Sequence, residues 1–515
     1  MNMFKATGRL ITPVIRALAS RKEQTADAAI AKQSLTLKKL LKKAGKTRFG
    51  RDHGFARIND LKSYQERVPI RSYEEFREIY WNAGFPVLDN VTWPGRIPYF
   101  AKTSGTTSGV SKFIPCTREM VRSNNRAGME VILAHFRNMP SSKILYGRYF
   151  MFAGSPKLQQ LSKGVFAGEL SGIAARETPV WAGRERYYPP DDLAAIGDWQ
   201  TKLDRISTDC LDKDIRAISG LPSWLQILFQ RIAAQAPDRK DRLSDWFPDL
   251  QLIVHGGMGF EPYRQYFQKL AEGTDIDFRE IYAASEGFFG IADRGNGDGM
   301  RLIVGNGVFY EFVPLDRYHE EDPPRHWLGN VEVGVDYVLV VTTCAGLWSY
   351  VVGDIVRFVD ISQFRVLFAG RLSQTLSKFG EKVLIDEVEA ALGAVMGRYG
   401  VNLDDYSISS NFEQDKGRHL YILELSERGD LESAEHIAEE IDKALRSENA
   451  GYATRRNNDV GILVPKVVFV ERGTFSSWMD AKGKAGGQHK VPRTIDYEHV
   501  QELRAISDGL RSRHG

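Results

Sequence analysis

The middle of this chain alternates apolar, strand-like runs with helical stretches, and this alternation limits the possible folds more than any other feature. Four runs carry the pattern: Ile144 to Phe152, Leu252 to His255, Glu280 to Ala283 and Tyr337 to Thr343. Strands that alternate with helices along a chain are typical of α/β folds. The sequence therefore predicts an α/β fold with at least one partly parallel sheet.

The pattern changes near Phe368 to Ser373, where the sequence reads FAGRLS. We expect the following elements beyond it: helices over Asp386 to Val395 and Ala434 to Arg446, and strands over Tyr406 to Ser410, His419 to Leu425 and Val467 to Val470. This α+β pattern has the size of a small separate domain. The prediction is thus a large domain over residues 35–369 and a small, mobile domain over residues 370–515.

Residues 1–34 are expected to form an N-terminal leader helix, and further helices are predicted over Ser34 to Lys43 and from Ser72. Basic residues dominate the start of the chain, with no acid before Glu23, and apolar residues recur there at helical spacing. We favour a helix that docks on the body, because a secretory cleavage site and a continuous apolar segment are both missing. A transit peptide and a membrane-surface helix are the alternatives.

Composition excludes several classes of function. The 515 residues are 43% hydrophobic, which is enough to bury large cores. The 69 basic and 66 acidic residues nearly cancel, so nucleic acid is not an expected partner. Cys116, Cys210 and Cys344 form no CxxC pair, which argues against disulfides and structural zinc and for a cytoplasmic location. No apolar run approaches the ~20 residues of a membrane helix, so we expect no integral membrane association.

A loop rich in glycine and hydroxyl side chains follows the aromatic stretch that ends at Phe100. It reads TSGTTSGVSK over Thr103 to Lys112. Glycines let backbone amides approach an anion, and hydroxyl and ammonium groups donate to phosphate oxygens. The loop is not a Walker A motif, because that motif needs Gly and Lys to be adjacent. We interpret it as a phosphate loop with Thr103, Ser104, Gly105, Thr106, Thr107, Gly109 and Lys112 as contacts.

Two later segments follow presumed strands, where α/β sheets usually bind ligands. The first, YAASEGFFG, supplies Tyr282, whose ring can stack on a purine, and Glu286, which can hold magnesium. The second, YVVGDIVRF, supplies Asp354, a carboxylate suited to accept both ribose hydroxyls. Taken alone, the first segment is equally compatible with core packing of Tyr282 and a solvated or capping Glu286, and a lone Gly-Asp in the second is more typical of a hairpin turn.

The phosphate loop, Tyr-x-x-Ser-Glu and Tyr-x-x-Gly-Asp follow one another in the order of the three nucleotide motifs of the adenylate-forming superfamily, which includes acyl-CoA ligases and firefly luciferase. More closely, the chain resembles the Gretchen-Hagen family, the auxin-responsive acyl-acid amido synthetases of plants and their bacterial relatives. The resemblance covers nearly the whole chain after about residue 35, through KAGKTRFGRDHGF, VPIRSYEEFRE, SGTTSG, GLPSWL, YAASEGFFG, FYEF and HKVPR.

The resemblance implies ATP and Mg²⁺ as cofactors and gives roles to individual residues. It assigns Tyr282 and Gly287 to adenosine, Glu286 to magnesium and Asp354 to ribose, within a large multi-sheet adenylate-forming domain and a smaller hinged one. The predicted nucleotide site is completed by Gly256, Gly257, Ala283, Ser285 and Arg371, and the catalytic residues are Lys490, Thr107 and Glu286. Gly370 and Arg371 match the superfamily's hinge, and Lys378, Gly380, Glu387 and Glu389 follow at the expected spacing.

Two positions depart from the family pattern. Val351 stands where plant members commonly have Arg, so Arg357 or Arg371 is the candidate replacement. Ser373 and Gln374 replace the acids common at the superfamily's hinge. Both departures bear on hinge mechanics more than on nucleotide binding.

The implied function is ATP-dependent activation of a carboxylic acid to an acyl-adenylate, followed by transfer to the amine of an amino acid. Aromatic residues favour a flat acid such as an indole or a benzoate, although core packing is the ordinary role of each. The candidate acid pocket comprises Phe166, Leu170, Trp181, Trp224, Phe288 and Phe289. Two alternatives remain: an acyl-CoA ligase that uses the same adenylate, and a non-catalytic protein that binds nucleotide or another ligand.

Overall fold

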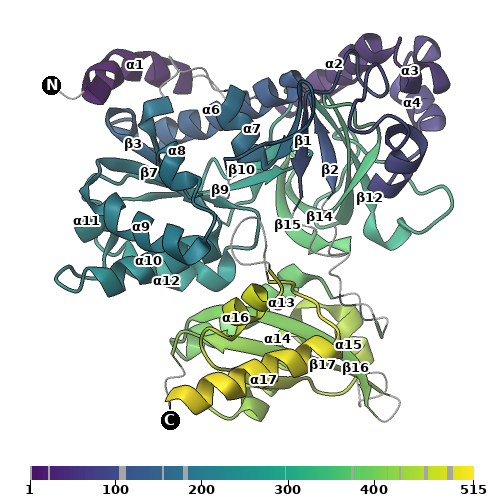
Figure 1. Cartoon of the computed structure of the whole chain (residues 1–515). Coiled ribbons are helices and arrows are strands. Elements are labelled where there is room, and N and C mark those ends of the chain that lie inside the picture. Colours follow the sequence, from purple (N-terminus) through teal and green to yellow (C-terminus); the bar gives the residue numbers. More distant parts are fainter. Residues whose placement is uncertain are drawn as a thin grey trace.

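We describe a computed structural model of the whole chain (Figure 1). It describes residues 3–20, 24–103, 112–152, 156–177, 184–295, 297–372, 376, 378–379, 381, 383–413, 416–427, 431–456, 462–483 and 491–514. No helix among these residues is long and apolar enough to cross a bilayer.

Eleven described strands form one sheet, in which the α/β pattern of the sequence is confirmed. Strands β9, β8, β7, β3 and β6 run parallel to one another, whereas every pair from β12 to β9 along the rest of the sheet is antiparallel. In spatial order the strands are β12 (Val308–Pro314), β13 (Asp336–Thr343), β14 (Tyr350–Asp360), β15 (Arg365–Arg371), β11 (Met300–Leu302), β10 (Gly287–Ile291), β9 (Asp277–Ala284), β8 (Leu252–Gly256), β7 (Ile215–Gly220), β3 (Arg148–Phe152) and β6 (Tyr187–Tyr188).

The antiparallel half of this sheet curls on itself. The hydroxyl of Tyr310 on β12 donates to the carbonyls of Ile303 (2.9 Å) and Phe289 on β10 (3.4 Å), although four strands separate β12 from β10 within the sheet. Curling allows residues of distant strands to meet in the interior. This feature builds the site described below.

A second, smaller sheet completes the multi-sheet large domain that we predicted. Its strands lie in the order β2 (Phe113–Cys116), β1 (Tyr99–Lys102), β5 (Val165–Gly168) and β4 (Gln159–Ser162). Strands β1 and β2 form an antiparallel hairpin, and β1 pairs parallel with β5. The predicted phosphate loop connects β1 to β2.

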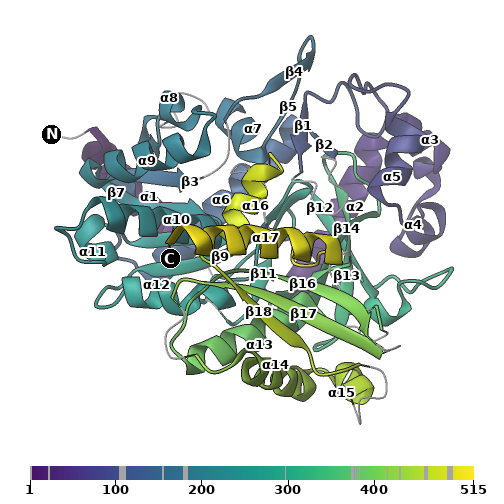
Figure 2. The same ribbon diagram turned by 60° about the horizontal axis from the view of Figure 1, so that its bottom comes forward.

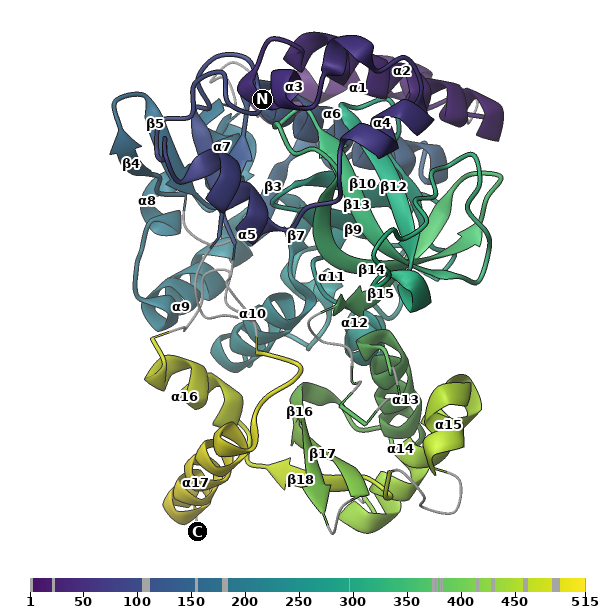
Figure 3. The same cartoon turned by 90° about the vertical axis from the view of Figure 1, so that its right-hand side faces the viewer.

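Helices cover both sheets (Figures 1 and 3). Those before β1 are α1 (Met3–Ala19), α2 (Ala26–Ala44), α3 (Arg48–Asp52), η1 (Phe55–Arg57), α4 (Leu61–Arg67), α5 (Tyr73–Phe76) and η2 (Arg77–Trp81). Those that follow are α6 (Arg118–Asn138), η3 (Ile144–Tyr146), α7 (Leu170–Glu177), η5 (Arg184–Arg186), α8 (Asp191–Ala194), α9 (Trp199–Asp209), η6 (Cys210–Asp212), α10 (Pro222–Gln235), α11 (Leu243–Trp246), η7 (Glu261–Tyr263), α12 (Arg264–Leu270) and η8 (Leu315–Arg317).

Helix α1 is docked on the body of the molecule. Its Ile15 and Ala19 are buried in a cluster with Phe136 of α6 and Ile144 of η3. The helix predicted from Ser34 is longer than expected and begins at Ala26, where the side chain of Thr25 caps it. The strand predicted from Ile144 is wrong in its first half, because Ile144–Tyr146 forms a 3₁₀ turn before β3 begins at Arg148.

The C-terminal residues form an α+β unit below the large sheet (Figure 1). Strands β16 (Leu403–Glu413), β17 (Lys416–Leu425) and β18 (Lys466–Val470) form its sheet, and its helices are α13 (Ile385–Arg398), α14 (Ala434–Glu448), α15 (Ala450–Arg456), α16 (Thr474–Ala481) and α17 (Tyr497–His514). Each predicted element of this region is confirmed, with ends shifted by a few residues.

Alternating side chains of β17 explain why helices cover both faces of the C-terminal sheet (Figure 2). Tyr421 and Leu423 are buried against α13 and α14, whereas Leu420 and Ile422 are buried against α16 and α17. Successive residues of a strand point to opposite faces, so one apolar run serves two layers of helices.

Candidate functional site

The curled sheet brings together four residues that we predicted to bind nucleotide. Asp354 and Arg371 are register partners on β14 and β15, and Arg371 Nε lies 3.0 Å from Asp354 Oδ1. Tyr282, from β9, donates from its hydroxyl to Asp354 Oδ2 at 2.8 Å. Glu286 lies in the two-residue turn between β9 and β10. Three separate segments of the sequence thus meet around one carboxylate.

Tyr350, to which no role was predicted, also belongs to this cluster. Its hydroxyl donates to Glu286 Oε1 at 3.3 Å, and its ring is fully buried. Tyr350 is the first residue of the Tyr-x-x-Gly-Asp motif, and this position could have identified it as a site residue from the sequence. It ties the second nucleotide segment to the third.

Burial controls the electrostatics of the cluster. Desolvation, together with repulsion from Asp354, raises the pKa of Glu286 to about 7, although Arg371 and the Tyr350 hydroxyl oppose this shift. Burial and Asp354 likewise raise the pKa of Tyr282 well above its ordinary value, which keeps that hydroxyl neutral and able to donate. Two buried carboxylates with one guanidinium leave an acidic cluster that favours an added cation.

The two flanks of the predicted phosphate loop lie side by side. The Thr103 amide donates to the Lys112 carbonyl and the Lys112 amide donates to Thr103 Oγ1, each at 3.1 Å. Lys112 Nζ lies 3.1 Å from a Glu74 carboxylate oxygen and 5.0 Å from the Tyr73 ring centroid. The other predicted contacts of the loop, Ser104, Gly105, Thr106, Thr107 and Gly109, lie outside the described residues.

Gly256 ends strand β8 beside the segment that carries Tyr282, and Gly257 follows it. A Cβ atom at Gly256 would lie 2.3 Å from the carbonyl oxygen of Ile281 on β9, so only glycine fits there. Gly257 has a φ of +79°, in the left-handed region that favours glycine. Ala283, Ser285 and Gly287 belong to the adjoining β9–β10 hairpin. These predicted nucleotide contacts therefore adjoin the acidic cluster.

The structure also distinguishes the two candidate replacements for the family's missing arginine. Arg357 pairs with Asp336, through contacts of 2.8 and 3.0 Å. Arg371 instead lies beside Asp354, and this carboxylate raises the pKa of its guanidinium. Val351 packs with apolar neighbours. Arg371 is thus the cation of the cluster.

The aromatic candidates for the acid pocket do not gather in one place. Phe166 and Leu170 pack against the large core around β1, with the Arg176 guanidinium 4.0 Å from the Phe166 ring centroid. Phe288 packs with α6, and Phe289 is fully buried beneath Tyr282. Trp224 belongs to a separate core and lines a cavity, and Trp181 lies outside the described residues.

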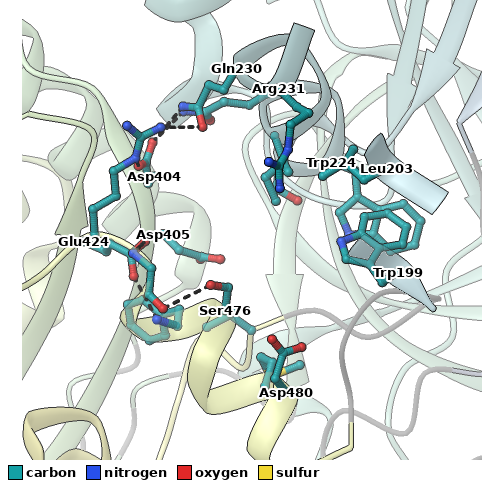
Figure 4. A pocket seen from close by; sticks show the side chains of 18 of the residues that line it. Trp199, Leu203, Trp224, Gln230, Arg231, Asp404, Asp405, Glu424, Ser476 and Asp480 are labelled. Carbon is teal, nitrogen blue, oxygen red and sulfur yellow. Dashed lines mark hydrogen bonds and ion pairs between the residues drawn. The ribbon is translucent and has the colours of Figure 1, made fainter. Parts of the chain in front are cut away.

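The cavity next to Trp224 has a volume of about 400 Å³ (Figure 4). Its wall combines residues of α9 and α10 in the large domain with residues of β16, α16 and the preceding loop in the C-terminal domain. The ring centroids of Trp199 and Trp224 are 5.2 Å apart at one side of it. Sequence reasoning missed this cavity, because its two halves are about 180 residues apart in the chain.

The segment that follows the predicted catalytic lysine is firmly anchored. Lys490 itself lies outside the described residues. Arg493 is buried, pairs with Asp405 and lies with its guanidinium carbon 4.1 Å from the Tyr406 ring centroid. Its Nη2 also donates to the hydroxyl of Tyr263 in the large domain at 3.5 Å. The HKVPR motif therefore ends in a contact between the two domains.

Comparison with known proteins places this chain in a family. Residues 18–205 match the GH3 family N-terminal domain, residues 301–370 its central domain, and residues 384–499 its C-terminal domain. The chain belongs to the GH3 family. The family resemblance that the motifs predicted is therefore confirmed.

Curated relatives match along nearly their whole length. The chain is 23% identical to a jasmonoyl–L-amino acid synthetase, JAR4, of Nicotiana attenuata, over 93% of each protein. It is also 23% identical to the indole-3-acetic acid-amido synthetase GH3.3 of Arabidopsis thaliana, over 96% of this chain and 93% of that protein.

Solved structures share the fold. The GH3.15 acyl acid amido synthetase superimposes with a TM-score of 0.73 at 17% identity and covers 98% of this chain and 96% of its own. A 2-hydroxyisobutyryl-CoA ligase in the postadenylation state matches with a TM-score of 0.61 at 18% identity, over 95% and 93% of the two chains. The predicted fold class, a multi-sheet large domain with a smaller C-terminal domain, is confirmed.

Proposed function

We propose that this protein is an acyl acid amido synthetase. It activates a carboxylic acid with ATP and passes the acyl group to the amine of an amino acid. The observation that carries the proposal is the cluster of Tyr282, Glu286, Asp354 and Arg371, which unites two nucleotide motifs in a member of a family whose named relatives are amido synthetases.

In the first half-reaction, a carboxylate oxygen of the acid attacks the α-phosphorus of ATP. A mixed anhydride forms between the acyl group and AMP, and pyrophosphate leaves with the electron pair of the broken P–O bond. In the second, the amine attacks the acyl carbon, the amide bond forms, AMP leaves and the nitrogen loses a proton. The acid must first be converted to the acyl-adenylate because a free carboxylate has no usable leaving group, whereas AMP can leave.

The described residues are suited to hold the nucleotide. Asp354 would accept the two ribose hydroxyls, with Tyr282 and Arg371 fixing its orientation from two sides. A neutral Tyr282 ring beside it would stack on adenine. The phosphate loop that leaves β1 at Lys102 and returns at Lys112 would cradle the phosphates.

Glu286 would hold Mg²⁺ together with the phosphate oxygens of ATP. No group of three or more His, Cys, Asp or Glu side chains among the described residues forms a complete metal site. Mg²⁺ is commonly bound through one or two carboxylates plus substrate phosphates, and a buried carboxylate with a raised pKa gains from a neighbouring cation, so Glu286 fits this role. When bound, the ion neutralises phosphate charge.

Lys490 and Thr107 keep their predicted catalytic roles on the basis of the family motif. A lysine that reaches the α-phosphate would stabilise charge developing there and on pyrophosphate. A domain that turns between the half-reactions would then expose the acyl carbon to the amine. We further propose a flat indolyl or benzoyl acid and a cytoplasmic location, as the sequence predicts.

The decisive experiment measures acid-dependent pyrophosphate release from ATP and Mg²⁺ over a panel of indolyl, aryl and aliphatic acids. Each acid is tested alone, with an amino-acid mixture and with coenzyme A. An amide product identified by mass spectrometry supports the proposal. A thioester would show an acyl-CoA ligase instead, and ATP binding without release by any acid would show a non-catalytic protein. Asp354→Asn, which removes the charge and replaces one of the two acceptor oxygens with a donor, is the matched inactive control.

A further inference from the structure

The N-terminal part of the chain carries a concentrated positive charge that the proposed reaction does not use. Residues 1–46 contain 11 basic and 2 acidic side chains, whereas the rest of the chain contains 58 basic and 64 acidic ones. Helices α1 and α2 hold most of this charge, and both lie at the end of the molecule that faces away from the C-terminal domain (Figures 1 and 3). Such a charge asymmetry within one chain is typical of a protein that binds a polyanion or an anionic surface.

Helix α1 carries three stripes of side chains, and only one of them is buried against the body of the protein. The buried stripe consists of Phe4, Gly8, Thr12, Ile15 and Ala19. The basic stripe consists of Lys5, Arg9 and Arg16, each of which follows a residue of the buried stripe. Because successive residues of a helix are about 100° apart, the basic stripe lies beside the buried one, and its three side chains are exposed.

The third stripe of α1 is apolar and points away from the body. It contains Leu10 and Val14, one turn apart and 77% and 58% exposed, with Ile11 at its edge and 47% exposed. Leu10 comes two residues after Gly8, so it lies about 200° from the buried stripe, nearly on the opposite side of the helix. Three large aliphatic side chains on one exposed helix face lose their contact with water only when this face meets another apolar surface or phase.

Helix α2 extends the basic surface. Its exposed face holds Lys38, Lys39 and Lys42. None of these lysines forms a salt bridge with another residue that the structure describes. Leu35, which is 49% exposed, lies on the same face. The opposite face is fixed to β12, because Gln33 donates to the Val308 carbonyl at 3.0 Å and accepts from the Tyr310 amide at 2.9 Å. The lysines therefore point away from the large sheet.

The combination of basic and apolar stripes indicates the kind of partner. Nucleic acid would neutralise the lysines but would offer no apolar phase to Leu10 and Val14. A second copy of the chain, docked symmetrically, would bring the basic stripes of two α1 helices together, and like charges repel. An anionic lipid bilayer suits both stripes, because its headgroups attract Lys and Arg and its acyl chains accept aliphatic side chains.

We propose that α1 and α2 form a docking surface for an anionic lipid membrane. Leu10, Ile11 and Val14 enter the boundary between headgroups and acyl chains, while the basic side chains of both helices contact the lipid phosphates. Helix α1 lies in the plane of the membrane, since its 17 residues span only about 25 Å and one of its faces stays on the body. Binding is peripheral and reversible, and it does not depend on the proposed reaction.

Cosedimentation of the full-length protein with lipid vesicles, without ATP or acid, tests this surface directly. Vesicles of phosphatidylcholine alone are compared with vesicles that also contain about 30% phosphatidylglycerol, an anionic lipid. We expect at least tenfold tighter binding to the anionic vesicles. This binding should weaken at least tenfold between about 0.05 M and about 0.5 M NaCl, because salt screens the attraction between exposed charges and the membrane.

Two double variants separate the apolar and basic contributions. Leu10→Gln with Val14→Gln removes the apolar stripe, and Lys38→Gln with Lys42→Gln removes two charges. Each pair should weaken binding to the anionic vesicles at least tenfold. The four side chains are exposed, so both variants should melt at the temperature of the natural protein. The lysine variant decides the matter if the α1 variant does not fold.

Matched controls remove the same kinds of side chain from other surfaces. Val333→Gln with Ile361→Gln replaces two aliphatic residues that are 54% and 45% exposed. Lys443→Gln with Arg511→Gln removes two charges from the C-terminal domain, at side chains that are 81% and 62% exposed. Both control variants should bind the anionic vesicles as tightly as the natural protein.

Several results would overturn the inference. Equal binding to the two kinds of vesicle, binding to neither, or unchanged binding by the Leu10 and Val14 variant would each do so. If the natural protein ignores vesicles but binds a DNA or RNA oligonucleotide, and the Lys38 and Lys42 variant does not, the surface belongs to nucleic acid. If it ignores vesicles but forms dimers that the Leu10 and Val14 variant does not form, the surface belongs to a second copy of the chain.

Discussion

The buried carboxylate of Glu286 makes the stability of the large domain depend on pH, and Glu286→Gln should remove that dependence. Burial and Asp354 raise the pKa of Glu286 from 4.5 to about 7 in the folded protein. Below pH 4.5 the side chain is protonated in both the folded and unfolded states, so its ionisation has no effect on stability. Between these values the folded state keeps a proton that the unfolded state has lost, so stability falls as pH rises.

The size of the effect follows from the two pKa values. A tenfold difference in proton affinity corresponds to about 1.4 kcal/mol, so ionised Glu286 destabilises the folded state by about 3 kcal/mol above pH 7. Glutamine has the same shape, accepts from the Tyr350 hydroxyl and carries no charge. The variant should therefore be more stable than the natural protein by about 1.4 kcal/mol at pH 5.5 and about 3 kcal/mol at pH 8.5.

Urea-induced unfolding followed by tryptophan fluorescence at the two pH values measures this difference. Glu272→Gln is the matched control, because its side chain is 70% exposed and its replacement should give the same difference at both values. A pH-independent difference for Glu286→Gln, or a natural protein that is the more stable one at pH 8.5, would refute the argument that this charge is buried without sufficient compensation. The same variant should lose acid-dependent pyrophosphate release.

Three further predictions use the same assays. Lys490→Ala should slow pyrophosphate release far more than it weakens ATP binding measured by calorimetry; an equal loss of both would contradict its catalytic role. Arg371→Met should raise KM for ATP about tenfold, which is the effect of losing one hydrogen bond to a charged group. Arg357→Met should leave KM for ATP unchanged. Similar effects of the two substitutions would show that Arg371 is not the cation of the site. Gly256→Ala should destabilise the protein by about 2 kcal/mol, because its Cβ would overlap a neighbouring backbone oxygen. Gly197→Ala, with open space around it, should not destabilise the protein. Equal melting temperatures of the two variants would disprove the close packing of β8 on β9.

The sequence by itself determined the fold class, most elements and the family. Apolar runs of strand length indicate which segments become strands, so the ends of β8, β9, β13 and the C-terminal elements were predictable within a few residues. The ordered motifs around Thr103, Glu286 and Asp354 carried the family membership. These features are local, because they depend on side chains close together in the chain.

Only the tertiary structure decided how these segments meet. The curl of the large sheet brings Asp354 on β14 to Tyr282 on β9. The spacing of apolar residues in the sequence does not predict that curl. The tertiary structure also shows that Arg371, and not Arg357, lies beside Asp354. It places Phe166 and Trp224 in separate cores. The cavity between the domains depends on the docking of two independently packed cores. Contacts of this kind are set by packing over the whole fold, so the composition of any one segment does not determine them.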